Sequence, residues 1–287
     1  MAANTRSPRL RAARALAKRA LRERSRQFLA EGPQAVREAL KYRSEHGGAD
    51  GTQAGLTELF VTGPARSRHI ELVEAAAAAG VPVHEVSGDV MAELAQTVTP
   101  QGLLAVCPFI DVPLDTLTSA RPALVVVLAN VRDPGNAGTV LRTADAAGAS
   151  GVIFAAASVD PYNSKCVRSS AGSIFHLPLV TGISADQAVS ALRGAGLVVL
   201  AADGSAEVGL DQLEANGRLS DPTAWLFGNE AWGLPGDIVA LADQAVAVPI
   251  YGQAESLNLA AAAAVCLYAS ARAHAGGAAQ PSPRARL

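Results

Sequence analysis

The sequence predicts an α/β protein in which a parallel sheet with helices on both sides follows a smaller α/β unit. Short apolar runs alternate with segments of helical periodicity along most of the 287 residues. The run Leu124–Leu128 contains only Leu and Val, which is typical of a strand buried on both faces of a parallel sheet. The chain is 49% hydrophobic at a length that fits two domains, which excludes a chain disordered throughout.

Residues 1–110 are expected to form the smaller unit. A helix rich in arginine should begin after Ser7, with Pro8 at its first position, and continue to about Arg26. The elements expected after it are, in chain order, a short apolar run at 27–30, a helix at 34–43, a surface loop at 46–54, a strand at 59–62, a helix at 68–79, a strand at 81–86, a helix at 89–97 and a strand at 102–108. A linker is expected at 111–121.

Residues 122–275 are expected to form the larger domain. After the strand Leu124–Leu128, the expected elements are strands at 151–155, 178–181, 196–201, 224–227 and 244–248, helices at 137–147, 165–171 and 185–193, and a long alanine-rich helix at 257–274. Strands and helices that alternate in this way predict a doubly wound parallel sheet. The tail at 276–287 is expected to be disordered.

The net charge of −2 hides a strong asymmetry, because residues 1–43 carry a net charge of +9 and the remainder carries −11. Of the 24 basic residues, 21 are arginines, which suit phosphate binding. A basic segment of this kind predicts contact with a polyanion, and a solvated charge run that stabilises a helix is the alternative interpretation. The residues expected to contact such a polyanion are Arg9, Arg11, Arg14, Lys18, Arg19, Arg22 and Arg132.

Several function classes lack support in the sequence. The three cysteines and five histidines are scattered, with no C-x-x-C or H-E-x-x-H, so neither a disulfide framework nor a metal site is expected. The most apolar stretch, at 259–269, is too short to span a membrane, and a reducing cytoplasm is the expected location. Dinucleotide, ATP and esterase motifs are missing. Six Phe, four Tyr and two Trp are too few for stacking on aromatic rings to dominate the binding of a polyanion.

Three polar, glycine-containing segments directly follow predicted strands, which is where ligands collect in open parallel sheets. The first runs from Asn130 to Gly138 and is followed by Arg142. Its simpler interpretation is a turn in which Asn136 caps a helix that begins near Ala137, but this leaves the arginines beside a buried strand unexplained.

The second segment, at 228–235, contains Glu230 between two glycines that permit close backbone approach, and a purely structural turn is the alternative. The third segment, at 248–258, leads into the alanine-rich helix, whose N-terminus offers free N–H groups to a ligand. Helix capping by Ser256 and Asn258 is the alternative interpretation of the third segment.

Together, the three segments resemble the motifs of the SpoU (TrmH-type) branch of the SPOUT RNA methyltransferases. The family motifs are an Asn followed by D-P-x-N-x-G and R-x-A, then G-x-E-x-x-G-L, then I-P-M-x-G-x-x-x-S-L-N. The matching positions are Asn130, Asp133, Pro134, Asn136, Gly138, Arg142, Ala144, Gly228, Glu230, Gly233, Leu234, Pro249, Gly252, Ser256, Leu257 and Asn258. Val248 replaces the Ile, and Ile250 replaces the Met. The resemblance covers 122–274, and a shorter one around 28–32 extends to the family's substrate-binding domain.

The resemblance implies a C-terminal SPOUT domain with a deep trefoil knot, S-adenosylmethionine as the cofactor, and a homodimer. No periodicity in the sequence reveals the knot, which is a rare exception among folds. The residues expected to bind the cofactor are Leu226, Phe227, Gly228, Asn229, Val248, Pro249, Ile250, Gly252, Ser256, Leu257 and Asn258. Those expected to take part in catalysis are Arg142, Asn136, Glu230, Ser256 and Asn258.

The implied reaction is methyl transfer to a ribose 2′-OH of structured RNA. Arg142 stands where the family places the residue that activates this hydroxyl. Because a guanidinium stays protonated in water, we expect it to bind the adjacent phosphate and stabilise the developing alkoxide rather than to act as a base. Asn136 and Glu230 would orient Arg142 or the ribose.

The expected substrate is 23S ribosomal RNA, because the resemblance includes an accessory N-terminal domain of the kind found in ribosomal RNA enzymes of this family. Resistance to a ribosome-directed antibiotic is one role that this layout allows. A tRNA ribose methyltransferase is the near alternative. A non-catalytic RNA-binding protein on the same fold is the alternative from another class, and the intact motif residues disfavour it.

Overall fold

The structure is a computed structural model, and it describes residues 7–47, 54–229 and 231–277. Its internal contacts divide the chain into two compact units, which are described one at a time. Unit 1 comprises Met1–Asp111, Asp133–Arg142 and Val159–Leu179, and unit 2 comprises Val112–Arg132, Thr143–Ser158 and Val180–Leu287. The smaller unit expected at 1–110 is therefore completed by two later segments of the chain. The predicted domain boundaries themselves stay a prediction.

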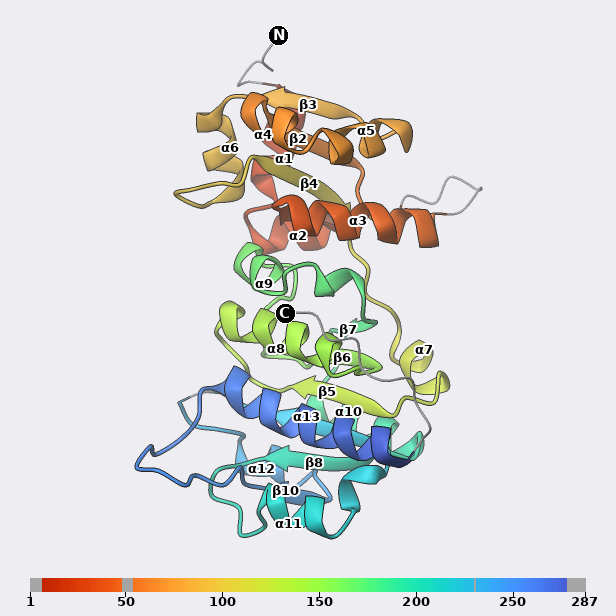
Figure 1. Ribbon diagram of the computed structural model, residues 1–287, viewed down its shortest axis with the longest axis vertical. Helices are drawn as coiled ribbons and strands as arrows, with labels where there is room; N and C mark the ends of the chain where they lie inside the picture. Colours follow the sequence, from red (N-terminus) through yellow and green to blue (C-terminus); the bar gives the residue numbers. More distant parts are fainter. Residues whose placement is uncertain (1–6, 48–53, 230, 278–287) are drawn as a thin grey trace. The chain divides into compact units, whose positions relative to one another are not determined.

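Unit 1 contains a mixed four-stranded sheet in the order β1-β4-β2-β3 (Figure 1). β1 (Gln27–Glu31) and β2 (Glu58–Thr62) pair antiparallel with β4 (Leu103–Pro108), and β3 (Val83–Val86) pairs parallel with β2. The helices that belong wholly to unit 1 are α1 (Pro8–Ala15), α2 (Arg19–Ser25), α3 (Pro33–His46), α4 (Gly63–Arg68), α5 (Ile70–Ala78), α6 (Gly88–Ala95), α9 (Ser164–Ser169) and the 3-10 helix η1 (Ser173–Phe175).

The arginine-rich N-terminal segment forms two helices rather than the single predicted one. Pro8 occupies the first helical position as expected, but the chain breaks after α1 and starts again at α2. Leu10, Ala13 and Leu16 are buried against apolar residues of α6 and of the sheet. The basic segment is therefore part of the core of unit 1 and not an appended arm. The helix expected at 68–79 also divides, into α4 and α5.

Unit 2 is built on a six-stranded sheet in the order β10-β8-β9-β5-β6-β7 (Figure 1). Neighbouring strands run parallel from β10 through to β6. The strands are β5 (Leu124–Leu128), β6 (Gly151–Phe154), β7 (Leu179–Thr181), β8 (Val198–Ala202), β9 (Thr223–Phe227) and β10 (Gln244–Val246). The helices along this part of the chain are α7 (Leu114–Ser119), α8 (Pro134–Ala146), α10 (Ala185–Gly194), α11 (Leu210–Ala215), the 3-10 helix η2 (Arg218–Ser220), α12 (Gly236–Val239) and α13 (Leu259–Gly277).

Both faces of the central strands are covered, which confirms the predicted α/β fold with a parallel sheet. All five residues of β5 are buried. Val125 and Val127 belong to one core cluster with Leu192 of α10. On β9, Trp225 is fully buried and donates a hydrogen bond from Nε1 to Oγ of Ser270 in α13, at 2.9 Å. The knot implied by the resemblance stays a prediction.

Several boundaries in this half of the chain differ from the predicted ones. The expected linker at 111–121 contains α7, whose Leu117 lies in the core of unit 2. The helices α11 and α12 were not predicted, because helices of six and four residues are too short to show periodicity. Residues 276–277 end α13 and do not begin a disordered tail, and the rest of that tail lies outside the described residues.

Two properties of the described residues concern membrane proteins and metalloproteins. None of the helices in this part of the chain combines the length and the hydropathy needed to cross a bilayer. Among the same residues, His, Cys, Asp and Glu side chains do not gather into a group of three that could hold a metal ion.

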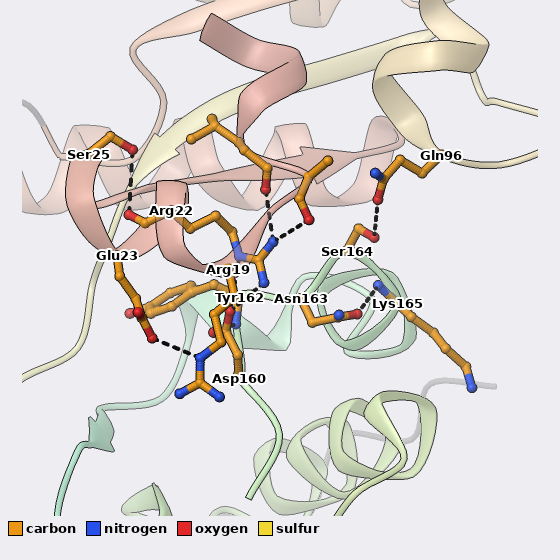
Figure 2. Close-up of polar contacts among 12 residues, drawn as sticks. Arg19, Arg22, Glu23, Ser25, Gln96, Asp160, Tyr162, Asn163, Ser164 and Lys165 are labelled. Atoms are coloured by element: carbon orange, nitrogen blue, oxygen red, sulfur yellow. Dashed lines mark hydrogen bonds and ion pairs between the residues drawn. The ribbon is translucent and has the colours of Figure 1, made fainter.

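A buried ion pair holds α2 in unit 1 (Figure 2). The Arg22 side chain donates from Nη2 and Nε to Oδ2 of Asp160, at 2.6 and 3.0 Å. Its Nη1 donates to the carbonyl oxygens of Leu16 and Ala17, at 2.8 and 3.0 Å, and so caps the end of α1. Oδ1 of Asp160 accepts a hydrogen bond from the backbone N–H of Tyr162. This network requires the break between α1 and α2, which gives Arg22 access to the free carbonyls.

The expectation that Arg22 binds RNA is corrected by this network. The residue is 4% exposed, and its donors are used inside the protein. Arg22 is therefore a structural residue. Neither interpretation of the basic segment, phosphate binding or a solvated charge run, holds at this position.

Replacing Arg22 is expected to destabilise the protein strongly. Arg22→Met would leave the Asp160 carboxylate buried without its cationic partner and α1 without its cap, which costs about 3–5 kcal/mol. Arg24→Met, at an exposed position of the same helix, should change the free energy of unfolding by less than about 0.5 kcal/mol. Urea denaturation followed by circular dichroism measures both variants. Equal, small losses for the two would show that the ion pair does not stabilise the fold.

Candidate functional site at the carboxyl edge of the parallel sheet

The strands β5, β9 and β8 are neighbours in the sheet and run parallel, so their carboxyl ends meet at one edge. From β5 the chain proceeds outward to β6 and β7, whereas β9 has β8 and β10 on its other side. The strand order therefore reverses between β5 and β9. Such a switch point is the place where open parallel sheets bind ligands.

A cavity of about 520 Å³ opens at this edge in unit 2. Its walls come from the ends of β8 and β9, the loop after β9, and the segment from β10 into α13. The residues that line it are Ala202, Asp203, Gly204, Ser205, Phe227, Gly228, Asn229, Ala231, Trp232, Gly233, Val246, Val248, Ile250, Glu255, Ser256, Leu257, Leu259 and Ala262. The volume falls in the range of sites for small molecules and cofactors.

Seven of the residues expected to bind the cofactor line this cavity, namely Phe227, Gly228, Asn229, Val248, Ile250, Ser256 and Leu257. Four do not, namely Leu226, Pro249, Gly252 and Asn258. The side chain of Leu226 instead belongs to the core of unit 2, because alternate residues of a strand face opposite sides of the sheet.

The loop after β9 is closed by its own hydrogen bonds. Asn229 and Gly233 exchange two backbone hydrogen bonds, each of 2.9 Å. Oδ1 of Asn229 accepts from the N–H of Ala231 at 2.8 Å, and Nδ2 donates to the carbonyl of Asn130 at 3.3 Å. A Cβ at Gly228 would lie 2.5 Å from the backbone of Gly233, so this position requires glycine. The second motif is thus fixed to the start of the first, and Glu230 lies outside the described residues.

The contribution of residues 202–205 to the lining of the cavity was not predicted from the sequence. The segment 202–205 follows β8 and so obeys the same strand-end rule, but it contains no motif that draws attention to it. Oδ1 of Asp203 accepts hydrogen bonds from the N–H and Oγ of Ser205, at 2.9 and 2.8 Å, which fixes the carboxylate at the cavity. Glu255 adds a second carboxylate to the lining. The cavity therefore combines apolar walls with negative charge, which suits a flat apolar ring attached to a cation.

The third segment carries a helix cap as well as cavity residues. Oδ1 of Asn258 accepts a hydrogen bond from the N–H of Ala260 at 2.9 Å, in the first turn of α13. The capping interpretation is therefore confirmed for Asn258. Ser256 is exposed and lines the cavity, so a polar interaction with a ligand suits it better.

In the first segment, Asp133 and not Asn136 caps the helix. Oδ1 of Asp133 accepts from the N–H of Asn136 at 2.8 Å, which explains why α8 begins at Pro134 rather than near Ala137. Nζ of Lys165 donates to Oδ2 of Asp133 at 2.6 Å and holds the pKa of that carboxyl below its usual range. The cap therefore stays ionised at neutral pH, where it stabilises the helix N-terminus.

The glycine of the first motif has a packing role. A Cβ on Gly138 would overlap Oγ of Ser169 and the carbonyl oxygen of Cys166. The two helices α8 and α9 can therefore pack this closely only because residue 138 is a glycine. Arg142 is exposed on α8, and its guanidinium forms no ion pair with the described carboxylates. Asn136 and Arg142 belong to unit 1, whereas Ser256 and Asn258 belong to unit 2. That these four act in one site stays a prediction.

The remaining residues expected to bind RNA differ in how available their charges are. Arg9, Arg11 and Lys18 are exposed, and none of them pairs with a carboxylate in the described part of the chain. Arg14 forms an ion pair with Glu93 at 2.6 Å, and Arg19 forms one with Glu23 at 2.8 Å. Arg132 is exposed in unit 2.

Comparison with known proteins identifies the family. The model of the SpoU rRNA Methylase family matches residues 123–268, which contain all three segments. The chain belongs to this family. A second model, the MRM3-like substrate binding domain, matches residues 7–105. The protein is thus an RNA methyltransferase of the SpoU type with a separate substrate-binding region.

Individual relatives of this SpoU methyltransferase cover nearly its whole length. It is 33% identical over 247 residues to the 23S rRNA (guanosine(2553)-2′-O)-methyltransferase RlmP of Bacillus subtilis, in a match that spans 86% of this chain and 89% of that protein. The AdoMet-bound rRNA methyltransferase from Sinorhizobium meliloti matches with a TM-score of 0.79 at 30% identity, over 95% of this chain and 97% of that one. AviRb from Streptomyces viridochromogenes, in complex with AdoMet, matches with a TM-score of 0.76 at 29% identity. The match covers 93% of this chain and 98% of the AviRb chain.

Proposed function

We propose that this SpoU methyltransferase transfers a methyl group from S-adenosylmethionine to a ribose 2′-OH of 23S ribosomal RNA. The observation that carries the proposal is the cavity at the carboxyl ends of β8 and β9, whose lining includes residues of the second and third motifs. The chain is similar over most of its length to RlmP, which is a 23S rRNA 2′-O-methyltransferase.

The cavity fits the proposed cofactor. Phe227, Val246 and Leu257 provide apolar walls for the adenine, and the closed loop at Gly228 lets backbone approach the ligand. Asp203 and Glu255 place negative charge where a cofactor with a sulfonium and an ammonium group would sit. When bound, S-adenosylmethionine supplies a methyl group activated by the positive sulfur. The protein then has to bring the hydroxyl to that methyl group and stabilise the charge that develops on its oxygen.

Arg142 supplies that stabilisation. Its guanidinium is a cation that holds a phosphate next to the ribose and stabilises negative charge on the attacking oxygen. Asn136, on the first turn of the same helix, orients Arg142 or the ribose. The close packing of α8 on α9 gives this helix a fixed position from which to act.

The basic residues of unit 1 bind the RNA backbone. Arg9, Arg11 and Lys18 carry exposed charges that pair with no carboxylate among the described residues, whereas Arg14 and Arg19 share theirs with glutamates. Phosphate binding of this kind depends little on sequence, so recognition of one RNA loop rests on shape.

Resistance to a ribosome-directed antibiotic is a second candidate role. The observation that favours it is the similarity to AviRb, which extends over 93% of this chain. A housekeeping modification of 23S rRNA requires the same chemistry, so only the position of the methylated nucleotide separates the two roles. Either role places the enzyme with ribosomes in the cytoplasm.

We also propose that the enzyme is a homodimer that associates through α13. Val265 and Tyr268 are 42% and 44% exposed on this otherwise well-packed helix, and Ala261 is exposed one turn before them. At helical spacing these residues form one apolar face. An apolar helix face of this kind is typical of subunit interfaces.

Methylation of purified RNA tests the main proposal. The wild-type protein should transfer labelled methyl groups to ribose in 23S rRNA, and not to tRNA. Arg142→Ala should lower kcat about 100-fold or more, while calorimetry shows unchanged binding of S-adenosylhomocysteine. Arg218→Ala, at an exposed arginine of unit 2, is the control and should remain active. Label in tRNA alone, or normal turnover by Arg142→Ala, would contradict the proposal.

Substituting three basic residues tests the RNA-binding surface. Removing residues 1–26 would weaken RNA binding, as the sequence suggests, but it would also open the core around Leu10. Changing Arg9, Arg11 and Lys18 to Gln instead should lower the slope of log affinity against log salt by about 0.7–0.9 for each phosphate that the variant no longer neutralises. Arg272→Gln, which removes an arginine paired with Glu214, should leave the slope unchanged. An unaltered slope in the triple variant would reject this surface.

Sedimentation tests the dimer. The wild-type protein should sediment at twice the chain mass of 29.2 kDa. Tyr268→Asp places a charge on the apolar face of α13 and should give a monomer at micromolar concentration, whereas Tyr268→Phe should remain a dimer. A monomeric wild type, or a dimeric Tyr268→Asp variant, would remove α13 as the interface.

A further inference from the structure

Trp232 is held out from the protein by the closed loop after β9. Its side chain is 63% exposed, although it lines the cavity. The two backbone hydrogen bonds between Asn229 and Gly233 close the loop, and Gly233 adopts a positive φ of 69°. The indole is thus exposed next to a residue, Gly233, whose backbone is bonded to Asn229 at the end of the buried strand β9.

A second aromatic side chain lies in the segment that forms another wall of the same cavity. Tyr251 is 90% exposed, and its neighbour Ile250 lines the cavity together with Trp232. Among the described residues, the exposed Trp and Tyr side chains are those of Trp232, Tyr251 and Tyr268. Two of these three belong to segments that border one cavity, in a chain with only twelve aromatic residues. An exposed aromatic side chain in the lining of a cavity, such as Trp232, indicates a contact surface.

The chemistry of the cavity indicates which part of an RNA meets these side chains. Asp203 and Glu255 give the cavity negative charge, which repels phosphates. An RNA that brings a ribose to this cavity therefore presents a base here more readily than its backbone. The flat face of an indole stacks on any base, and such stacking requires no countercharge.

We propose that Trp232 stacks on a base of the substrate RNA next to the ribose that is methylated. This inference rests on the proposed function, because it takes the cavity as the site from which the methyl group is transferred. Trp232 then positions the acceptor nucleotide. The adenine of the cofactor and a second copy of the chain are the other occupants that could cover the indole.

Fluorescence distinguishes these occupants, because the chain contains only two tryptophans. Trp225 is fully buried, so quenching by acrylamide, an uncharged quencher, reports on Trp232. Quenching is measured for the protein alone, with S-adenosylhomocysteine, and with S-adenosylhomocysteine plus unmodified 23S rRNA made by transcription. The proposal requires that quenching falls only when RNA is added. Protection by S-adenosylhomocysteine alone, or protection that grows with protein concentration without RNA, would overturn it.

Kinetics provide the second readout. Trp232→Ala should raise KM for 23S rRNA about tenfold or more, with unchanged affinity for S-adenosylhomocysteine and an unchanged sedimentation coefficient. Trp232→Phe keeps a flat ring and should restore most of the affinity for RNA. Ile70→Ala removes an exposed apolar side chain in unit 1 and serves as the control. An unchanged KM in Trp232→Ala, or an equal loss in Trp232→Phe and Trp232→Ala, would overturn the proposal.

The two proposals fail in different ways. A wild-type protein that methylates neither rRNA nor tRNA would refute the proposed function. Quenching requires no turnover, so it would still show in that case whether the indole of Trp232 stacks on RNA. A wild type that methylates 23S rRNA while Trp232 stays open to acrylamide would refute only the stacking proposal.

Discussion

The burial of β5 and β9 on both faces is the constraint on which the rest of unit 2 depends. All the residues of these two strands are buried, and helices pack on either side of the sheet. A strand buried in this way offers no room for charged side chains along its length, so polar residues occur only where the strand ends. Because neighbouring strands are parallel, these ends meet at one edge, and the polar segments that follow them come together. The cavity is a consequence of this arrangement.

The same constraint explains how much of the fold could be predicted. Leu124–Leu128 was predicted with the correct bounds because a run of Leu and Val of that length has one plausible structure. The break between α1 and α2 was missed because alanine and arginine favour an uninterrupted helix. What separates the two helices is an ion pair between residues 138 positions apart, Arg22 and Asp160. No local pattern contains that information.

The candidate site was predictable where a motif determines the backbone. Gly228 and Gly138 each stand where a Cβ would overlap other atoms, so their spacing in the motifs reflects packing. Asp203 carries no such restriction and was missed, although it follows a strand that was predicted. Counting charges was least informative for the basic segment, because the count does not separate the buried Arg22 from the exposed Arg9. Burial and pairing divide these arginines into structural residues and residues that can bind phosphate.

The positive charge of residues 1–43 and the negative charge at the cavity of unit 2 have a common physical reason. A cofactor with a positive sulfur is best held by carboxylates, and Asp203 and Glu255 line the cavity of unit 2. These carboxylates weaken the binding of any phosphate at the same place, so the RNA backbone has to be held by other residues of the chain. The net charge of +9 on residues 1–43 meets that need, even after Arg22 and the paired arginines are set aside. At the cavity itself, contact with RNA then has to come from uncharged groups, and the exposed ring of Trp232 is such a group.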